Sequence, residues 1–265
     1  PVRLHDFQGF RNAIPIGVYE FHLSYQEALT GDFGTAISHI LPSDRISIHL
    51  PDYLPGNRIV DPVSDNTDVR VESRQLIERV LEFADYLTDR IGVSVPIVGS
   101  FSQTNGRSRY DALDDIFSYL DSDTVKRHAI FPQWLPVFAW YFGGSVKLSL
   151  FNSEEDISYI ERHQGWICLD LCHLVLSANS SSVPWRAWYE RLKSYTGHLH
   201  FADAVGVDGE GLQLGTGDIG CFSGFLDSDV LKIIEVWQGH HNGGRGFLEA
   251  LSVLSLQSNN MKDHV

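Results

Sequence analysis

The sequence has little of what marks nucleic-acid-binding or membrane proteins. Its 265 residues contain 20 Lys+Arg against 34 Asp+Glu, a formal net charge of −14. A chain this negative repels the phosphates that nucleic-acid-binding proteins must neutralise. No apolar run approaches the ~20 residues that a membrane helix needs. Apolar residues still make up 43% of the chain, which excludes disorder. We therefore predict a folded protein that binds neither nucleic acid nor membranes.

Cysteine is also scarce. Cys168, Cys172 and Cys221 are odd in number and show no spacing typical of a zinc site. No signal peptide is recognisable, so we expect a reduced, cytoplasmic protein. The chain begins at Pro1 rather than Met, and we expect a trimmed chain or a domain taken from a longer protein.

Apolar strand-like runs alternate with amphipathic helical segments, and no repeat or flexible linker divides residues 1–265. The predicted strands are 16–24, 46–50, 93–101, 146–151, 166–171, 198–202 and 231–237, with 129–133 needed as a further strand to make eight. The predicted helices include 72–90, 153–163 and 184–195. This alternation over ~250 residues predicts an α/β protein, a single (β/α)8 TIM-barrel domain. No GxGxxG or Walker motif favours a doubly wound sheet.

Titratable residues follow one predicted strand after another. In a TIM barrel the active site lies at the carboxyl ends of the strands, so these residues predict a site there. Asp170 in WICLDLCH and Glu235 in LKIIEVW are the sharpest candidates, because a charge inside an apolar strand is costly unless it is paired or metal-bound. The others are Glu20, His22, His49, His173, His198, His200 and Asp203.

Each of these residues also has a simpler interpretation. His22 and His49 suit hydrogen-bonded core histidines as well as ligands, and Asp203 suits a cap of the loop that follows it. The segment 240–245, with His240 and Arg245, suits either a solvated loop or an anion-binding loop. Asp, His and Glu together suit Mn, Mg, Co or Zn, whereas the alternative is a polar cluster that binds its ligand without metal.

Four motifs resemble the xylose isomerase-like TIM-barrel superfamily, which includes sugar isomerases and epimerases and the family 2, endonuclease IV-type AP endonucleases. They are ICLDLCH (167–173), GHLHFADAVG (197–206), LQLGTGDIG (212–220) and IIEVWQG (233–239). The resemblance implies that Asp170, His200 and Glu235 are metal ligands. It also implies that Glu235 is an acid/base catalyst and that His173 contacts the substrate or supports the ligands.

The sequence departs from this superfamily at two places. Phe151 and Asn152 stand where the fifth strand usually ends in Glu, and Gln213 replaces the usual loop His. The missing Glu is expected to weaken metal binding. It also puts in doubt an epimerase mechanism that needs a carboxylate on each face of the substrate.

A narrower resemblance covers nearly the whole chain. The segments EFHLS (20–24), HLPDYL (49–54), WYFGG (140–144) and EVWQGHHNGG (235–244) are similar to a TIM-barrel domain associated with N-acetylneuraminate synthase-type proteins. This likeness implies sialic-acid-like (nonulosonic acid) sugar metabolism, with a synthase domain in the same pathway or chain as a partner.

The leading expectation is a sugar isomerase or epimerase acting on a sugar or sugar phosphate. A metal-polarised carbonyl would let a carboxylate remove the adjacent proton. The expected catalytic residues are Glu235, Glu20 and His173, and the expected substrate-binding residues are His22, His49, Asp203, His240 and Arg245. The alternatives are a non-catalytic sugar-binding or regulatory domain and, third, an AP endonuclease, which needs more metal ligands and a basic face. Whether the chain is an enzyme stays open.

Overall fold

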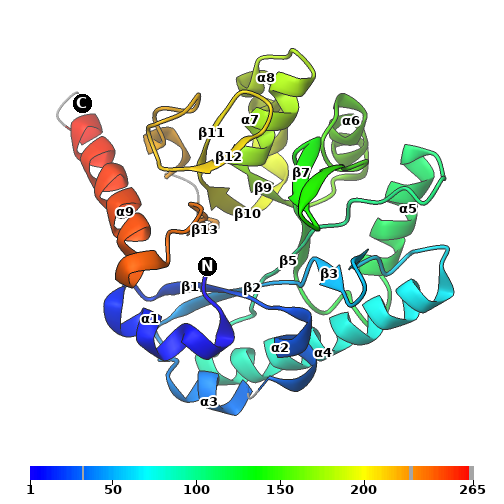
Figure 1. The fold of residues 1–265 in the computed structure, drawn as a ribbon, viewed down its shortest axis with the longest axis horizontal. Helices are drawn as coiled ribbons and strands as arrows, with labels where there is room; N and C mark the ends of the chain where they lie inside the picture. The colour runs from blue at the N-terminus through cyan, green and yellow to red at the C-terminus, as the bar shows by residue number, and fades with distance from the viewer. Residues whose placement is uncertain (32, 227–228, 263–265) are drawn as a thin grey trace.

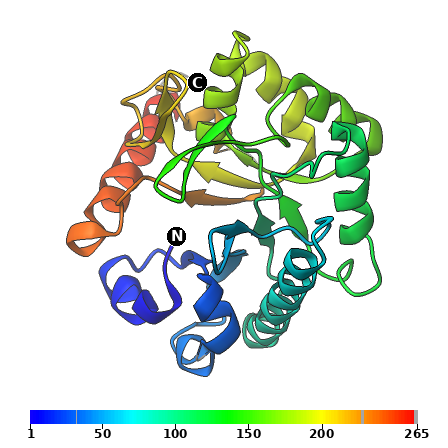
Figure 2. The ribbon, with the colours of Figure 1, turned by 45° about the vertical axis from the view of Figure 1, so that its right-hand side comes forward.

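Seven parallel strands lie at the centre of the molecule, and helices surround them (Figures 1 and 2). The structure is a computed structural model that describes residues 1–31, 33–226 and 229–262. The strands form two hydrogen-bonded sheets, ordered β1-β2-β5-β6 and β13-β10-β9. They are β1 (Val18–His22), β2 (Arg45–His49), β5 (Ile97–Gly99), β6 (Ile130–Pro132), β9 (Ile167–Asp170), β10 (Thr196–Phe201) and β13 (Leu231–Ile234).

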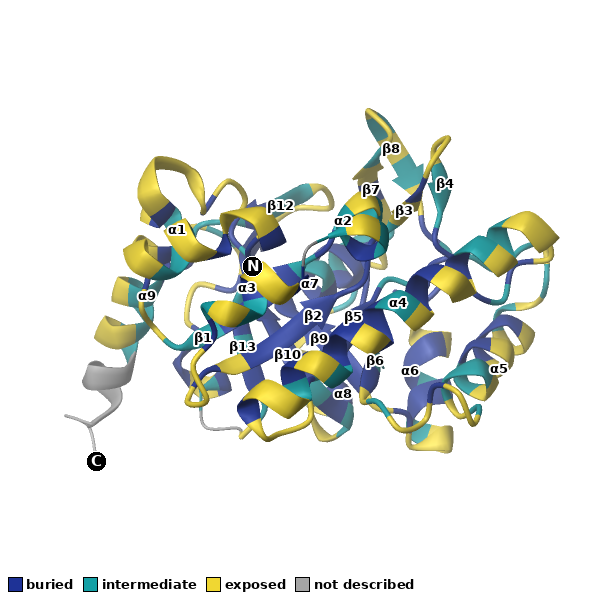
Figure 3. Cartoon of the chain, turned by 90° about the horizontal axis from the view of Figure 1, so that it is seen from below, coloured by how far each residue is buried: buried dark blue, intermediate teal, exposed yellow. Residues whose placement is uncertain are grey.

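Three antiparallel hairpins lie outside these sheets. They pair β3 (Tyr53–Leu54) with β4 (Arg58–Ile59), β7 (Phe138–Tyr141) with β8 (Gly144–Lys147), and β11 (Asp203–Val205) with β12 (Gly209–Leu212). The first two follow the carboxyl ends of β2 and β6, and they project from the same end of the molecule (Figure 3). They therefore stand at the edge of any site built from the strand ends.

The helices cover the outside of the strands. They are α1 (Phe7–Ala13), α2 (Tyr25–Thr30), α3 (Phe33–Ser38), α4 (Thr67–Ile91), α5 (Arg109–Leu120), α6 (Glu154–His163), α7 (Leu171–Ser180), α8 (Trp185–Leu192) and α9 (His241–Lys262). Burial follows this arrangement: the strands are buried, and exposed residues lie on the outer faces of the helices (Figure 3). All four residues of β9 are buried, as expected for a parallel strand covered on both faces. No helix in the described ranges is both long and apolar enough to cross a membrane.

Local sequence signals fix the ends of the helices. The Asn66 side chain caps α4 by accepting hydrogen bonds from the first N–H groups of the helix. Gly92 ends α4 with a φ of 77°, a left-handed conformation that glycine adopts without steric cost. Asp170 ends β9 and caps α7, accepting the backbone N–H of His173. The geometry at the end of β9 therefore fixes one carboxylate of the candidate site.

The sequence predicts seven of the expected eight strands correctly, including 129–133, which is confirmed as β6. The predicted strand 146–151 is wrong. Residues 138–147 form the β7–β8 hairpin instead, because Phe142 and Gly143 both have positive φ, as a two-residue hairpin turn requires. Phe151 also has a φ of 57°, which interrupts an extended strand.

The hydrogen-bonded ladder does not close into a ring within the part of the chain that the structure describes. One bridge, Gln133 to Cys168, joins the two sheets at β6 and β9. On the opposite side, β1 and β13 form no ladder, and Val2 bridges Phe21 of β1. The fold is therefore mixed α/β with parallel sheets, and the closed eight-stranded barrel expected from the sequence is not observed.

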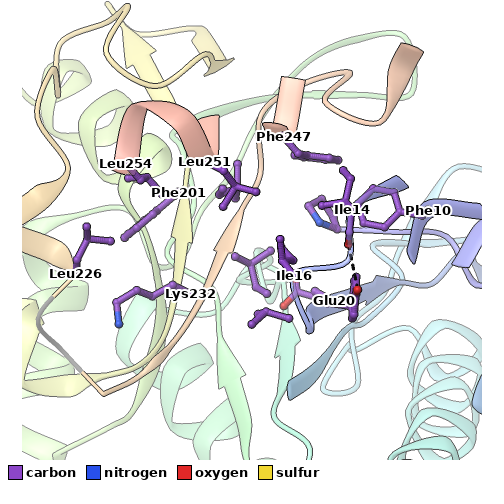
Figure 4. Close-up of a pocket in the computed structure, with 15 residues that line it drawn as sticks. Phe10, Ile14, Ile16, Glu20, Phe201, Leu226, Lys232, Phe247, Leu251 and Leu254 are labelled. Atoms are coloured by element: carbon purple, nitrogen blue, oxygen red, sulfur yellow. Dashed lines mark hydrogen bonds between the residues drawn. The ribbon is translucent and has the colours of Figure 1, made fainter. Parts of the chain in front are cut away.

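An apolar cavity of about 320 Å³ lies where β1 and β13 fail to pair (Figure 4). Side chains from α1, β13 and α9 surround it, and the aromatic rings of Phe10 and Phe247 pack edge to face beside it at 5.6 Å. Glu20 also lines this cavity, at its border with the strand interior. The cavity marks the point at which a closed barrel would need its last pair of strands.

Replacing Phe151 with Ala should lower the free energy of unfolding by about 3–5 kcal/mol, the usual cost of deleting a buried aromatic side chain. Phe151 is fully buried, and its ring packs near Phe117. Urea denaturation of the two proteins measures the difference. The exposed Phe138→Ala is the matched control and should cost less than about 1 kcal/mol. Equal effects of the two substitutions would contradict this account of residue 151.

Candidate metal centre

The carboxyl ends of β9 and β10 place polar side chains in register. Asp170 lies opposite His200 on the neighbouring strand, and Cys168 lies opposite His198 two residues deeper. Because side chains two apart on a strand share a face, both pairs point the same way. Glu20 of β1 reaches them from the other sheet and contacts both histidines. The interior therefore holds two layers of polar groups, with the upper layer at the strand ends.

Asp170, His200 and Glu235 converge in the upper layer. One donor atom from each lies within 4.8 Å of the others. His200 Nδ1 is 2.7 Å from Glu235 Oε2 and 3.8 Å from Asp170 Oδ2. Glu235 Oε2 is buried, yet it accepts no hydrogen bond of normal geometry. When His200 is protonated, this nitrogen and this carboxylate oxygen form an ion pair; without that proton, they lie close enough to bind one cation together.

Glu20 fixes the orientation of His200. Its carboxylate is fully buried and lies 3.1 Å from His200 Nε2, 3.2 Å from His198 Nε2 and 2.8 Å from His22 Nε2. Ser47 Oγ donates a further hydrogen bond of 2.8 Å. Burial alone would raise the pKa of Glu20, but His200, His198 and His22 outweigh it and hold that pKa well below its usual value. An ionised Glu20 accepts the proton of His200 Nε2, which leaves Nδ1 free to bind a cation.

His200 and Glu235 perturb each other strongly. Burial lowers the pKa of His200, but the charges of Glu20 and Glu235 and a hydrogen bond with Asp170 outweigh it and raise that pKa well above 6.5. Burial raises the pKa of Glu235, but the charge of His200 outweighs it and lowers that pKa below its usual value. Without a cation, His200 is therefore an imidazolium among carboxylates. A bound divalent cation would supply the positive charge that this proton otherwise provides.

Gln133 is a member of the centre that the resemblance does not single out. Its Nε2 lies 3.1 Å from Asp170 Oδ2 and 3.2 Å from His200 Nδ1, and its Oε1 accepts the hydroxyl of Ser100 at 3.0 Å. The superfamily pattern points to residue 151 for a fifth-strand Glu, but Phe151 is buried away from this centre. Gln133 is the residue beside the ligand atoms. Its signal in the sequence is weaker than that of Asp170 and Glu235: it is a single uncharged polar residue between the apolar residues of 129–132 and 134–142.

His173 and Glu210 extend the centre towards solvent. His173 Nδ1 lies 3.2 Å from Asp170 Oδ2 and 3.0 Å from the Trp134 carbonyl, and Nε2 lies 3.1 Å from Glu210 Oε1. Burial lowers the pKa of His173, but the charges of Asp170 and Glu210 outweigh it and raise that pKa to about 9. His173 therefore carries a proton at neutral pH.

The rings of His22 and His49 lie beside the centre, tilted by 36° with their centroids 4.6 Å apart. Burial and the charge of His49 lower the pKa of His22. Burial also opposes the charged form of His49, but the charges of Asp52, Glu20 and Glu235 outweigh it and raise its pKa. His49 Nδ1 donates to the Leu50 carbonyl at 2.8 Å, so its Nε2 faces Gln133 Oε1 at 3.1 Å. Both rings face the pocket described next.

A pocket of about 380 Å³ opens above the centre. Its floor is polar, and aromatic side chains line its mouth. The floor includes His22, His49, Gln133, Asp170, His173, Glu210 and Glu235. The mouth includes Tyr53, Trp140, Tyr141 and Trp237, which come from the β3–β4 and β7–β8 hairpins and from the segment after β13. Tyr53 packs edge to face on Tyr141 at 5.1 Å, whereas Trp140 is 63% exposed and available to a ligand.

Two residues expected to bind substrate lie elsewhere. Asp203 is fully buried and does not line the pocket. Its carboxylate holds the loop after β12 by accepting the backbone N–H groups of Gly215, Gly217 and Ile219. Arg245 forms an ion pair with Glu249 on the exposed side of α9. The anion-binding loop suggested for 240–245 therefore brings only His240 to the pocket.

The sequence matches no family model and no curated protein. Among solved structures, the chain is similar to the crystal structure of SacUVDE, a UV damage endonuclease, with a TM-score of 0.55 and 16% sequence identity. The similarity covers 89% of this chain and 79% of that one. At this identity the similarity concerns the fold alone. It supports a TIM-barrel-like arrangement without singling out the xylose isomerase-like superfamily or the synthase-associated domain.

Replacing Gln133 with Glu should tighten the binding of Mn²⁺ or Zn²⁺ by about tenfold or more, because a carboxylate replaces an amide beside the other ligand atoms. Competition with a fluorescent chelator measures the affinity. Phe151→Glu should give no such gain and should destabilise the fold, because it buries an unpaired charge. Tighter binding by Phe151→Glu than by Gln133→Glu would show that residue 151 approaches the metal.

Proposed function

We propose that this protein is a metal-dependent sugar isomerase built on a TIM-barrel-like fold. The observation that carries the proposal is the convergence of Asp170, His200 and Glu235, with the second nitrogen of His200 held by buried Glu20. This arrangement lies at the carboxyl ends of the strands, where enzymes with this architecture have their active sites. The four sequence motifs that resemble the xylose isomerase-like superfamily, which includes sugar isomerases as well as AP endonucleases, are compatible with this assignment.

The donor set suits Mn, Mg, Co or Zn, because it combines two carboxylates with one imidazole and has no accessible thiolate. The nearest thiol, Cys168, is fully buried, and burial raises its pKa to about 12. A cation held by Asp170, His200 and Glu235 supplies Lewis-acid polarisation of a substrate carbonyl when it is bound. Gln133 Oε1 accepts the Ser100 hydroxyl, and it would become a weaker fourth ligand only if the side-chain amide rotated so that Oε1 and Nε2 exchanged places.

The residues around this position have different roles in proton transfer. His173 is protonated at neutral pH and lines the pocket, so it can donate a hydrogen bond or a proton to a substrate oxygen. Glu235 is ionised and 24% exposed, so its carboxylate can accept a proton from a carbon beside the carbonyl. Glu20 has no exposed surface and is occupied by three histidines, so it acts as a positioning residue for His200.

The centre favours isomerisation over epimerisation. Moving a proton between adjacent carbons on one face of a substrate needs one base, whereas inverting a carbon needs groups on both faces. Gln133 and Glu235 both approach His200 Nδ1, and the Gln133 amide cannot accept that proton. Of the other carboxylates in the floor, Asp170 caps α7 and Glu210 pairs with His173, so Glu235 is the proposed base.

The pocket suits a neutral sugar. Aromatic side chains at its mouth offer flat apolar faces to the C–H groups of a sugar ring, and the polar floor offers hydrogen bonds to hydroxyls. Asp52 and Glu210 add negative charge to the lining of the pocket, which disfavours a phosphate or carboxylate beside them. A role in nonulosonic acid metabolism, with a synthase partner, stays a prediction from the sequence resemblance.

Metal-dependent cleavage of damaged DNA is a second candidate, and the structural similarity to SacUVDE is the observation that favours it. The formal charge of −14 weighs against it, because a DNA-binding face must attract phosphates. Glu210 and Asp52 in the pocket lining would repel the phosphates of an incoming DNA strand. We therefore rank this activity below sugar isomerisation.

Cation affinity should rise with pH well beyond 6.5. A cation must displace the proton of His200, whose pKa is raised, so the logarithm of the binding constant should rise by about one unit per pH unit up to that raised pKa. An unperturbed imidazole would level off near pH ~6.5. Titrations with Mn²⁺ between pH 6 and 9 test this, and Glu20→Gln should bring the plateau to lower pH. A flat affinity above pH 6.5 would contradict the assigned charge of His200.

The activity itself is tested by incubating the metal-loaded protein with neutral aldoses in D2O. NMR should show ketose formation with deuterium exchange at the carbon beside the carbonyl, and Glu235→Gln should lower the rate by about 10²-fold or more. Glu190→Gln, on the exposed side of α8, is the control and should leave the rate unchanged. Saturable sugar binding without exchange would favour the non-catalytic binding domain instead. Cleavage of UV-damaged DNA would favour the endonuclease.

A further inference from the structure

A second polar pocket lies on the helical layer, away from the metal centre. It has a volume of about 530 Å³, and its lining residues come from α4, the loop before α5, and α5 with the segment that follows it. Figure 1 labels α4 and α5 among the helices outside the strands. Three arginines line it: Arg70, Arg74 and Arg107. Two acidic residues line it as well, Glu78 and Asp115. Its lining therefore carries a formal charge of +1 (three arginines minus two acids) in a chain whose net charge is −14.

Most of the charge on these arginines is not neutralised by carboxylates. Arg70 donates to the Ser64 carbonyl and the Thr67 hydroxyl. Arg74 Nε donates to the Pro62 carbonyl at 2.8 Å. The two Nη atoms of Arg74 make no hydrogen bond within the described residues, and its guanidinium stacks on the Tyr119 ring at 5.2 Å.

Arg107 gives the most specific signal. Its side chain is 19% exposed, and it uses Nη1 for Asp115 and Nε for the Thr104 carbonyl. Its Nη2 is buried and has no hydrogen-bond partner in the structure. A buried guanidinium N–H without a partner costs free energy, so such a group normally meets an ion or water.

We propose that this pocket binds a phosphate group, carried by a small phosphorylated metabolite or present as free phosphate. Guanidinium groups are planar donors that match the oxygens of phosphate, and three of them line one pocket here. The hydroxyls of Ser118, Ser122 and Thr124 line the same pocket and supply further donors. Glu78 and Asp115 at the lining disfavour a long polyanion such as nucleic acid, so the expected ligand is small.

This pocket is separate from the sugar site. None of its lining residues lines the pocket above the metal centre. A phosphate held here would lie away from the proposed sugar substrate, so its role would be regulatory or structural. The proposal does not depend on the proposed isomerase activity.

Isothermal titration calorimetry of the chelator-treated protein with inorganic phosphate tests the proposal, at constant ionic strength set with NaCl. We expect saturable binding that Arg107→Gln and Arg74→Gln each weaken by about tenfold or more. Arg79→Gln is the matched control, because Arg79 lies on α4 outside the pocket and pairs with Glu82. Asp115→Asn should tighten binding, because it removes the carboxylate that competes for Arg107. This gain keeps the test valid if an arginine variant fails to fold.

Glycerol phosphate in a parallel titration distinguishes the two sources of the phosphate group. Tighter binding than inorganic phosphate supports a metabolite, and weaker binding supports the free ion. Binding that is unaffected by Arg107→Gln, or that chloride replaces equally well, would overturn the proposal. So would binding that disappears in Asp170→Asn and persists in Arg107→Gln, because the phosphate would then lie at the metal centre.

Discussion

The buried carboxylate of Glu20 is the constraint on which the rest of the centre depends. A fully buried charge is stable only when surrounding groups compensate it, and Glu20 meets His22, His198 and His200 together with the Ser47 hydroxyl. These partners come from three strands in both sheets, so the pairing also joins the sheets where their ladders do not. Because Glu20 engages one nitrogen of His200, the other nitrogen faces Asp170 and Glu235. The buried carboxylate of Glu20 therefore determines which nitrogen of His200 is presented to the carboxylates at the strand ends.

Much of the fold and part of the centre could be predicted from the sequence, for a physical reason. Buried parallel strands are continuous apolar runs, so a charge within one, such as Asp170, stands out. The pairing of Asp170 with His200 follows from register once both strands are placed. The strand predicted at 146–151 failed because its apolar residues serve a hairpin and a buried turn, and local pattern does not distinguish these from a strand. Gln133 was not predicted as part of the centre, because an uncharged polar residue at the end of a strand is also typical of an ordinary loop.

The absence of a strand at 146–151 changes the chemistry expected of the metal centre. If a strand ended at Phe151, the centre would lack the carboxylate with which the fifth strand of the superfamily usually ends. The structure instead places Gln133 beside Asp170 and His200. The position is therefore occupied by a group that can bind weakly but cannot take a proton. Similarly, Asp203 was a plausible substrate ligand because it follows a predicted strand, yet its carboxylate accepts hydrogen bonds from the backbone of a loop. In both cases tertiary contacts that are remote in sequence decide the role of a side chain.

The central claim is that Asp170, His200 and Glu235 hold one divalent cation through His200 Nδ1. A crystal structure of the protein grown with Mn²⁺, with an anomalous difference map, tests it most directly. The account predicts one strong peak within about 2.0–2.3 Å of Asp170, Glu235 and His200 Nδ1, with His200 Nε2 still directed at Glu20. The peak should be absent in Asp170→Asn. A map without a peak there, or with the cation bound at Cys168 and His198 instead, would contradict the account.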